Sequence, residues 1–384
     1  MSSTCTVRYF YPNHISDIAV ARVMLRMARE MELSGLECFL YGNSGSEEIT
    51  RRFPNFKPLI PRPLKFFVYH AFAWNTICRS TSLLFARHVR GGDVAYLWPG
   101  ATPELYKILR RKGVTTITEM INTCQSHARE VLLKEFQNIG LPYRALITQK
   151  SIEQENQILS LSDYFFSPSP EVSSSLVKAG VNPKKILKST YGINAQDRVS
   201  PKDAIYESGK LNFLHVGTIG VRKGVHRLIE AWVNSSIEGT LTLAGNIDPE
   251  FKPILDNYLV KYGSRINVLP YTENISEVFQ SANIFVLLSL EEGSPLVTYQ
   301  AMGHGLPSMV SPMGGGGVIK HEKNGIMVNP YDKSEIIAQM QRLAIDKWLL
   351  RSLGQQAYAD SEKLLWSKVA YHRAKLIAEV KSQE

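Results

Sequence analysis

The chain has 384 residues, which is long enough for two domains that each bury their own core. With 44% hydrophobic and 21% charged residues, and no run of eighteen apolar residues, it reads as neither disordered nor membrane-spanning. The formal net charge of +9 favours an anionic partner.

Four cysteines are scattered through the first third of the chain without the paired spacing of a metal site. They are Cys5, Cys38, Cys78 and Cys124. We expect them to be reduced cytosolic thiols. Residues 1–30 lack a basic stretch followed by an apolar run, which argues against a secretory signal, so a cytoplasmic location is expected.

The first half of the chain alternates β-rich runs with helical patterns. Strands are expected at 7–12, 38–43, 94–100, 114–121 and 164–170. The helical pattern after the first strand has Ile15, Val23 and Met27 on one face, and polar helices reach to about residue 161. This alternation predicts a parallel, doubly wound sheet.

Residues 51–90 form a basic and aromatic segment. It contains no Asp or Glu, and its Lys and Arg side chains alternate with aromatic ones. The aromatic residues include Phe66, Phe67, Phe72 and Trp74. We expect a surface that faces an anionic membrane, because basic and aromatic side chains together favour the headgroup region. The alternative is that the aromatics form the domain core. Nucleic acid is not expected, since no binding module for it is recognisable.

Residues 191–210 lose apolar periodicity and gather Gly, Asn, Asp, Ser and Pro, as an interdomain linker does. We therefore expect a first domain at 1–195 and a second at 208–360. In the second domain, strands are expected at 211–217, 239–246, 266–271, 283–289 and 307–312. The terminal segment 361–384 has one apolar face and is expected to be a helix that docks back on the first domain.

Residues 213–232 read as a buried strand, a loop that includes Gly217, and a helix opened by Arg222 and Lys223. Ligands of parallel sheets bind at the carboxyl ends of the strands. The free N–H groups of a helix N-terminus and the lysine charge together suit a diphosphate. The alternative is a glycine turn with two solvated basic residues.

Residues 283–312 carry a second motif, in which a strand ends at Glu291-Glu292-Gly293-Ser294 and a helix begins near Pro295. Backbone amides at such a helix start can hold a phosphate, while Glu292 accepts hydrogen bonds from sugar hydroxyls. A capped helix with surface acids is the alternative. Residues 314–317 are four glycines, which either bring N–H groups against an anion or form only a flexible turn.

The order and spacing of GTIGVRKG, EGSPLVTYQAMGHGLP, the glycine run and KNGIMVNP resemble the family 4 glycosyltransferases. The resemblance is strongest over 211–332 and weaker over 162–186. It implies a GT-B fold of two facing Rossmann-like, doubly wound α/β domains with a cleft between them. It also implies a retaining transfer from a nucleoside-diphosphate sugar, held mostly by the second domain, to a glycan or lipid-linked acceptor, held mostly by the first.

The resemblance also implies roles for single residues. Lys223 matches the lysine that binds the diphosphate, and Glu292 matches the first glutamate of a Glu-seven-residues-Glu pattern that contacts the donor sugar. Gln300 stands where the second glutamate holds the ribose hydroxyls; an amide can still accept one hydrogen bond and donate another. Thr218 replaces a common arginine, and Arg222 is expected to supply that charge. The expected donor-binding residues are Gly217, Thr218, Gly293, Ser294, Pro295, Leu296 and Gln300.

On the acceptor side, many relatives place a functional histidine at the end of a first-domain strand. Here Glu119 and Asn122 occupy that neighbourhood, and His127 lies one turn further on. The resemblance implies that the acceptor attacks on the face from which the diphosphate leaves, so that no catalytic carboxylate pair is needed. Arg222, Lys223 and Glu292 are the expected catalytic residues. The sequence has no Asp-x-Asp motif, and we expect neither a metal nor another cofactor.

Two other functions remain open. A nucleotide-sugar 2-epimerase would use the same architecture, although its cluster of His and carboxylates is not recognisable. A binding subunit that has lost turnover is suggested by Gln300 and Thr218.

Overall fold

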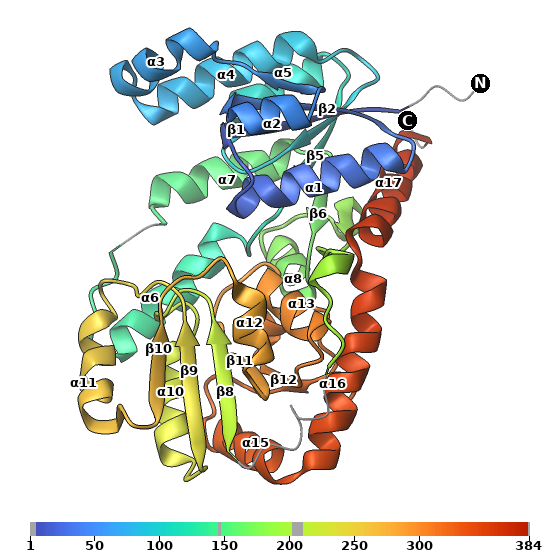
Figure 1. Ribbon diagram of the computed structural model, residues 1–384. Coiled ribbons are helices and arrows are strands. Elements are labelled where there is room, and N and C mark those ends of the chain that lie inside the picture. The colour runs from blue at the N-terminus through green and yellow to red at the C-terminus, as the bar shows by residue number, and fades with distance from the viewer. Residues whose placement is uncertain (1–4, 145–146, 202–209, 383–384) are drawn as a thin grey trace.

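The computed structural model describes residues 5–144, 147–201 and 210–382, which form two α/β domains stacked one above the other (Figure 1). The expected domain limits at residues 1–4, 202–209 and 383–384 lie outside the described residues. No described helix is both long and apolar enough to cross a lipid bilayer.

The first domain is built on seven parallel strands in the order β3-β2-β1-β4-β5-β6-β7. The strands are β1 (Thr6–Ile15), β2 (Glu37–Gly45), β3 (Phe56–Pro58), β4 (Val94–Leu97), β5 (Thr115–Glu119), β6 (Tyr164–Ser167) and β7 (Ile186–Lys188). The helices are α1 (Ala19–Leu33), α2 (Glu47–Arg52), α3 (Lys65–Ala71), α4 (Trp74–His88), α5 (Pro103–Arg111), α6 (Gln125–Asn138), α7 (Gln149–Leu161) and α8 (Pro170–Lys178).

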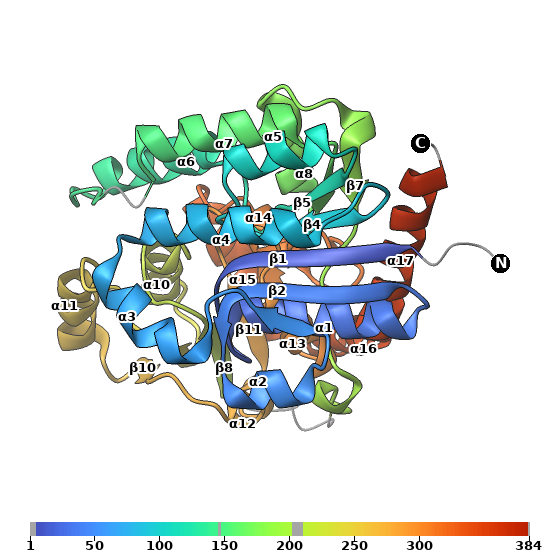
Figure 2. The ribbon, with the colours of Figure 1, turned by 90° about the horizontal axis from the view of Figure 1, so that it is seen from above.

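Helices cover both faces of this sheet (Figure 2). On one face, Tyr9 of β1 shares a core with Met24 and Met27 of α1. On the other, Phe10 stacks on Phe85 of α4, with ring centroids 4.5 Å apart. Successive side chains of a strand point to opposite faces, so a strand buried on both sides must be apolar along its whole length. This is why β4, at the centre of the sheet, is apolar along its whole length.

The second domain repeats the architecture with six parallel strands in the order β10-β9-β8-β11-β12-β13. The strands are β8 (Leu211–Val216), β9 (Gly239–Ala244), β10 (Ile266–Leu269), β11 (Ile284–Leu287), β12 (Ser308–Val310) and β13 (Ile326–Met327). The helices are α10 (Val225–Asn234), α11 (Lys252–Tyr262), α12 (Ile275–Gln280), α13 (Leu296–Gly303), α14 (Pro312–Gly315), α15 (Lys333–Ile345) and α16 (Lys347–Ser361). The predicted fold class, two facing doubly wound domains, is thus confirmed.

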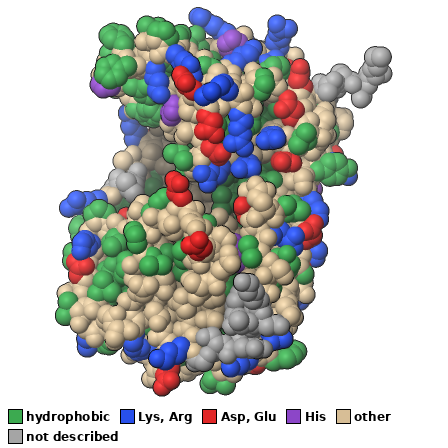
Figure 3. Space-filling model, in the orientation of Figure 1, with side chains coloured by type: hydrophobic (Ala, Val, Ile, Leu, Met, Phe, Trp, Pro, Cys, Tyr) green, Lys and Arg blue, Asp and Glu red, His purple; other side chains and the backbone are tan. Residues whose placement is uncertain are grey.

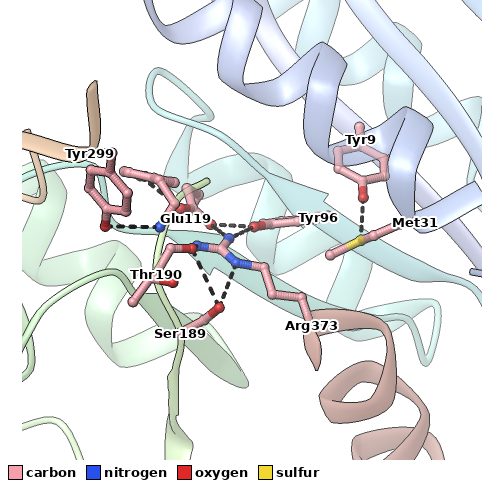
Figure 4. A network of polar contacts seen from close by, with 9 residues as sticks. Tyr9, Met31, Tyr96, Glu119, Ser189, Thr190, Tyr299 and Arg373 are labelled. Carbon is pink, nitrogen blue, oxygen red and sulfur yellow. Dashed lines mark hydrogen bonds and ion pairs between the residues drawn. The ribbon is translucent and has the colours of Figure 1, made fainter. Parts of the chain in front are cut away.

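The last helix, α17 (Trp366–Ser382), leaves the second domain and packs along α1 of the first (Figure 1). Its Arg373 is fully buried and forms an ion pair with Glu119 of β5, Nη1 to Oε2 2.7 Å (Figure 4). Tyr96 donates a hydrogen bond to the same carboxylate, and Tyr191 donates to its Oε1 at 2.8 Å. Because a buried charge needs partners on all sides, this network fixes α17 to the first domain.

Candidate functional site

The loop between β8 and α10 is shaped by glycines. Gly217 has φ +136° and Gly224 has φ +67°, a region that side-chain-bearing residues rarely adopt. A Cβ on Gly224 would lie 2.0 Å from the carbonyl oxygen of Leu288, just beyond β11. The loop therefore packs its backbone against the next strand, and this close approach places Arg222 and Lys223 beside the loop after β11.

Two cations and two carboxylates meet where β8 and β11 end. Arg222 Nη1 lies 3.0 Å from Glu291 Oε2, and its Nη2 lies 3.4 Å from Glu292 Oε1. Lys223 pairs with the same oxygen of Glu292. Burial alone would lower the pKa of Arg222, but Glu292 and Glu291 raise it above its usual value. The structure thus brings together the three residues that the sequence predicts to be catalytic.

Glu291 was not predicted as a site residue, although it lies next to Glu292. It is buried, and its Oε1 accepts hydrogen bonds from Thr123 of the first domain, from Oγ1 at 2.9 Å and from the backbone N–H at 3.3 Å. Its other oxygen pairs with Arg222. Glu291 therefore joins the loop after β5 to the cation cluster after β8.

The segment Gly293–Leu296 leads from this cluster into α13. A Cβ on Gly293 would lie 1.8 Å from the carbonyl oxygen of Ile121, so this close approach of the two domains requires glycine. Ser294 Oγ donates to the Gly316 carbonyl at 3.0 Å and lies 2.5 Å from the Tyr299 hydroxyl. Pro295, expected at the first helical position, is instead the N-cap of α13 with an extended ψ of 118°, so the helix begins one residue later, at Leu296.

Two of the remaining donor-side residues are more exposed to solvent. Gln300 lies on α13 and is partly buried, and Thr218 is exposed after β8. His215, on β8, is buried near Lys223, and burial followed by this lysine lowers its pKa to about 4. The neutral imidazole therefore adds no charge to the cluster at neutral pH.

The glycine run forms a short helix and a turn. The Gly314 N–H is taken by the hydroxyl of Ser311 at 3.0 Å, and the Gly315 N–H by its carbonyl oxygen at 2.8 Å. Gly316 and Gly317 follow with φ of +54° and +74°. Two of the four N–H groups therefore donate to Ser311, which precedes the run.

The three expected acceptor-side residues lie in different surroundings. Glu119 is buried, and both of its carboxylate oxygens accept hydrogen bonds in the network with Arg373 and Tyr191. Asn122 is exposed on the loop after β5, and His127 is partly buried on the first turn of α6. Only Glu119 and Asn122 line the neighbouring cavity.

This cavity of about 640 Å³ lies between α4 and α7 and is called here the α4–α7 cavity. Its wall also includes the loops after β4 and β5, and Glu291 of the second domain. Trp98 lines it, and within the part of the chain that the structure describes its Nε1 donor has no hydrogen-bond partner. The cavity therefore extends from the first domain to the cation cluster. Its wall offers a buried hydrogen-bond donor to a bound ligand.

Glu155 of α7 lines the same cavity and was not predicted. Its Oε2 accepts the backbone N–H of Gln125 at 2.6 Å, where the N-cap of α6, Cys124, makes no side-chain cap. Burial raises the pKa of Glu155 to about 7. The carboxyl thus caps α6 and changes its charge near neutral pH.

Comparison with known proteins identifies the second domain. Residues 210–346 match the family model of the glycosyl transferases group 1. An uncharacterized glycosyltransferase of Methanocaldococcus jannaschii is 25% identical over 213 residues, 52% of this chain and 53% of that protein. The UDP-Gal:alpha-D-GlcNAc-diphosphoundecaprenol alpha-1,3-galactosyltransferase of Escherichia coli is 33% identical over 86 residues, 22% of each chain. The matches thus span about half or less of these relatives.

Solved structures resemble the chain over nearly its whole length. Sucrose-phosphate synthase of Thermosynechococcus elongatus superposes with a TM-score of 0.75 at 18% identity, over 99% of this chain and 100% of that one. HepE of Anabaena, in complex with UDP-glucose, gives 0.69 at 12% identity, over the same shares. These likenesses establish the fold. Residues 210–346 therefore match the glycosyl transferases group 1, within a chain that has the two-domain GT-B fold.

Proposed function

We propose that the protein is a retaining glycosyltransferase that moves a sugar from a nucleoside-diphosphate sugar to a hydroxyl of a glycan or lipid-linked acceptor. The observation that carries the proposal is the contact of Lys223 and Arg222 with Glu292 at the ends of β8 and β11. Cations for a diphosphate and a carboxylate for sugar hydroxyls thus lie side by side. The UDP-glucose bound to HepE and the UDP-galactose named for the Escherichia coli relative support a nucleotide-sugar donor.

In this proposal the donor diphosphate lies against Lys223, Arg222 and the N–H groups at the start of α13. Glu292 orients the donor sugar, and Gln300 contacts the ribose. The acceptor oxygen attacks the anomeric carbon while the bond from that carbon to the diphosphate oxygen breaks. The acceptor proton passes to the departing diphosphate on the same face. Stabilisation of the developing negative charge by the two cations is then the main catalytic contribution, and no metal is required.

The basic and aromatic segment supports a membrane partner for the acceptor side. Phe66, Phe67, Phe72 and Trp74 are 75%, 62%, 49% and 45% exposed, so these four do not form the domain core. Phe56 and Phe85, by contrast, are buried. Figure 3 shows hydrophobic side chains on the surface over α3, at the upper left. An anionic bilayer would cover this apolar surface while attracting the surrounding Lys and Arg, each by about 1 kcal/mol.

A thermal-shift screen of UDP-, GDP- and ADP-sugars tests the donor, because a ligand that binds only the folded state raises Tm. We expect one nucleotide class to raise Tm, and the same sugar nucleotide to be consumed when an acceptor is added. No shift with any of them would contradict the proposal. A shift without transfer to any acceptor would instead favour the binding subunit suggested by Gln300 and Thr218.

A further inference from the structure

The α4–α7 cavity begins at the helix that carries the exposed aromatic surface. Trp74 belongs to that surface and also lines the cavity, as do Asn75 and Arg79 of the same helix. The opposite end of the lining is Glu291, which pairs with Arg222 of the donor cluster. The cavity thus connects the expected membrane side of the first domain with the cations expected to hold the donor.

The charges of the cavity wall do not cancel. Of its carboxylates, Glu119 is paired with Arg373, and Glu291 with Arg222. Glu155 loses much of its charge near neutral pH, because burial raises its pKa to about 7. This leaves the two cations of the wall, Arg79 and Lys150.

Arg79 of α4 and Lys150 of α7 both line the cavity and are exposed, and neither forms an ion pair with any residue in the described ranges. They lie on the two helices that give the cavity its name. An anionic group in the cavity would therefore meet two cations without first displacing a carboxylate from either. Trp98 offers a further unpartnered donor on the same wall.

We propose that the α4–α7 cavity binds an acceptor whose sugar is linked through a phosphate or diphosphate to an apolar chain, with Arg79 and Lys150 on the anionic linkage. The apolar chain lies toward Trp74 and the exposed surface of α3 and α4. The acceptor sugar lies toward Asn122 and Glu291. This inference rests on the proposed function and narrows its acceptor from any glycan to an anionic, lipid-linked one.

The test is calorimetric titration of the full chain with three probes in the presence of saturating nucleoside diphosphate, so that the donor site is filled. The probes are farnesyl diphosphate, farnesol and inorganic pyrophosphate. Farnesyl diphosphate should bind to the wild type, and R79Q and K150Q should each weaken its affinity at least tenfold. The controls are K107Q and R110Q, which change exposed residues of α5 outside the cavity lining. They should change the affinity less than twofold. Farnesol should bind at least tenfold more weakly, because it lacks the anion.

Equal binding of farnesol, absence of farnesyl diphosphate binding, or no effect of R79Q and K150Q would overturn the proposal. Pyrophosphate that binds as tightly as farnesyl diphosphate would indicate a free-phosphate site and would also overturn it. Nucleoside-diphosphate binding by R79Q and K150Q should stay at the wild-type value, so failure of this inference is distinguishable from failure of the donor site.

Discussion

Arg227 of α10 holds Glu135 of α6 at two points across the domain interface, Nε to Oε1 2.7 Å and Nη2 to Oε2 2.7 Å. His226 Nε2 lies 2.5 Å from the same carboxylate. Arg227 lies in the first turn of α10, a few residues after Arg222 and Lys223, which lie in the loop that leads into this helix. The ion pair therefore ties the first domain to the helix that follows the donor cations.

The Glu135 contacts should make the folded protein sensitive to acid. Burial alone would raise the pKa of Glu135, but the hydrogen bonds from His226 and Arg227 lower it to about 2, below its usual 4.5. The stabilisation is present above pH 4.5 and is lost as pH falls toward 2, with a magnitude of about 2–3 kcal/mol. Urea unfolding of wild type and Glu135→Gln across this range should give a stability difference that shrinks with falling pH. A difference independent of pH would contradict this account.

Glu155 should act in the opposite direction. Burial raises its pKa to about 7, so the folded state favours the protonated carboxyl. The protonated carboxyl contributes fully to the free energy of unfolding below pH 4.5. This contribution, about 1–3 kcal/mol, is lost as pH rises through 7. The free energy of unfolding of Glu155→Gln, relative to wild type, should therefore rise between pH 4.5 and 8. If the two proteins keep a constant difference over this range, the carboxyl does not titrate as described.

Arg373→Met should destabilise the protein by about 3–5 kcal/mol, because it leaves the buried carboxylate of Glu119 without its cation. Urea unfolding measures the loss. Adding Glu119→Leu to the same chain should recover part of it, since the unpaired charge is then removed. The exposed Lys375→Met on the same helix is the control and should change stability by less than about 0.5 kcal/mol. An Arg373→Met protein as stable as the control would mean that the pair does not hold α17.

The fold and the donor cluster could be predicted because their signals are local. Arg222, Lys223 and Glu292 lie within two short motifs, and each motif sits where a strand meets a helix. The interdomain contacts have no such signal: Glu135 and Arg227 are 92 residues apart, and Glu119 and Arg373 are 254 apart. The sequence places Glu119 only by its strand end.

Three strands were missed for a different reason. β3 and β7 span three residues each and β13 spans two, too few for an alternating pattern to stand out from a loop. Sequence periodicity likewise could not decide which aromatics of residues 51–90 are exposed, since Phe66 and Phe85 both lie in helices and it is the packing of α4 on β1 and β2 that buries Phe85.

The exposed aromatics should drive binding to anionic membranes. Wild type should float with vesicles that contain phosphatidylglycerol, less so at high salt, and little with phosphatidylcholine alone. F66S combined with F67S should reduce flotation, because both rings are more than half exposed on α3. Val260→Ser, at 90% exposure on α11 of the other domain, is the matched control. Flotation unchanged by the double substitution would contradict a membrane role for this surface.

The central claim is that Lys223, beside Glu292, holds the donor diphosphate, and calorimetric titration with the nucleoside diphosphate that raises Tm tests it most directly. Lys223→Ala should weaken binding by about 1.5–3 kcal/mol, the usual value for a hydrogen bond to a charged group. Lys252→Ala, an exposed lysine paired with Asp256 on α11, should bind as wild type does. Unchanged affinity of Lys223→Ala, or an equal loss in Lys252→Ala, would contradict the assignment of the donor site.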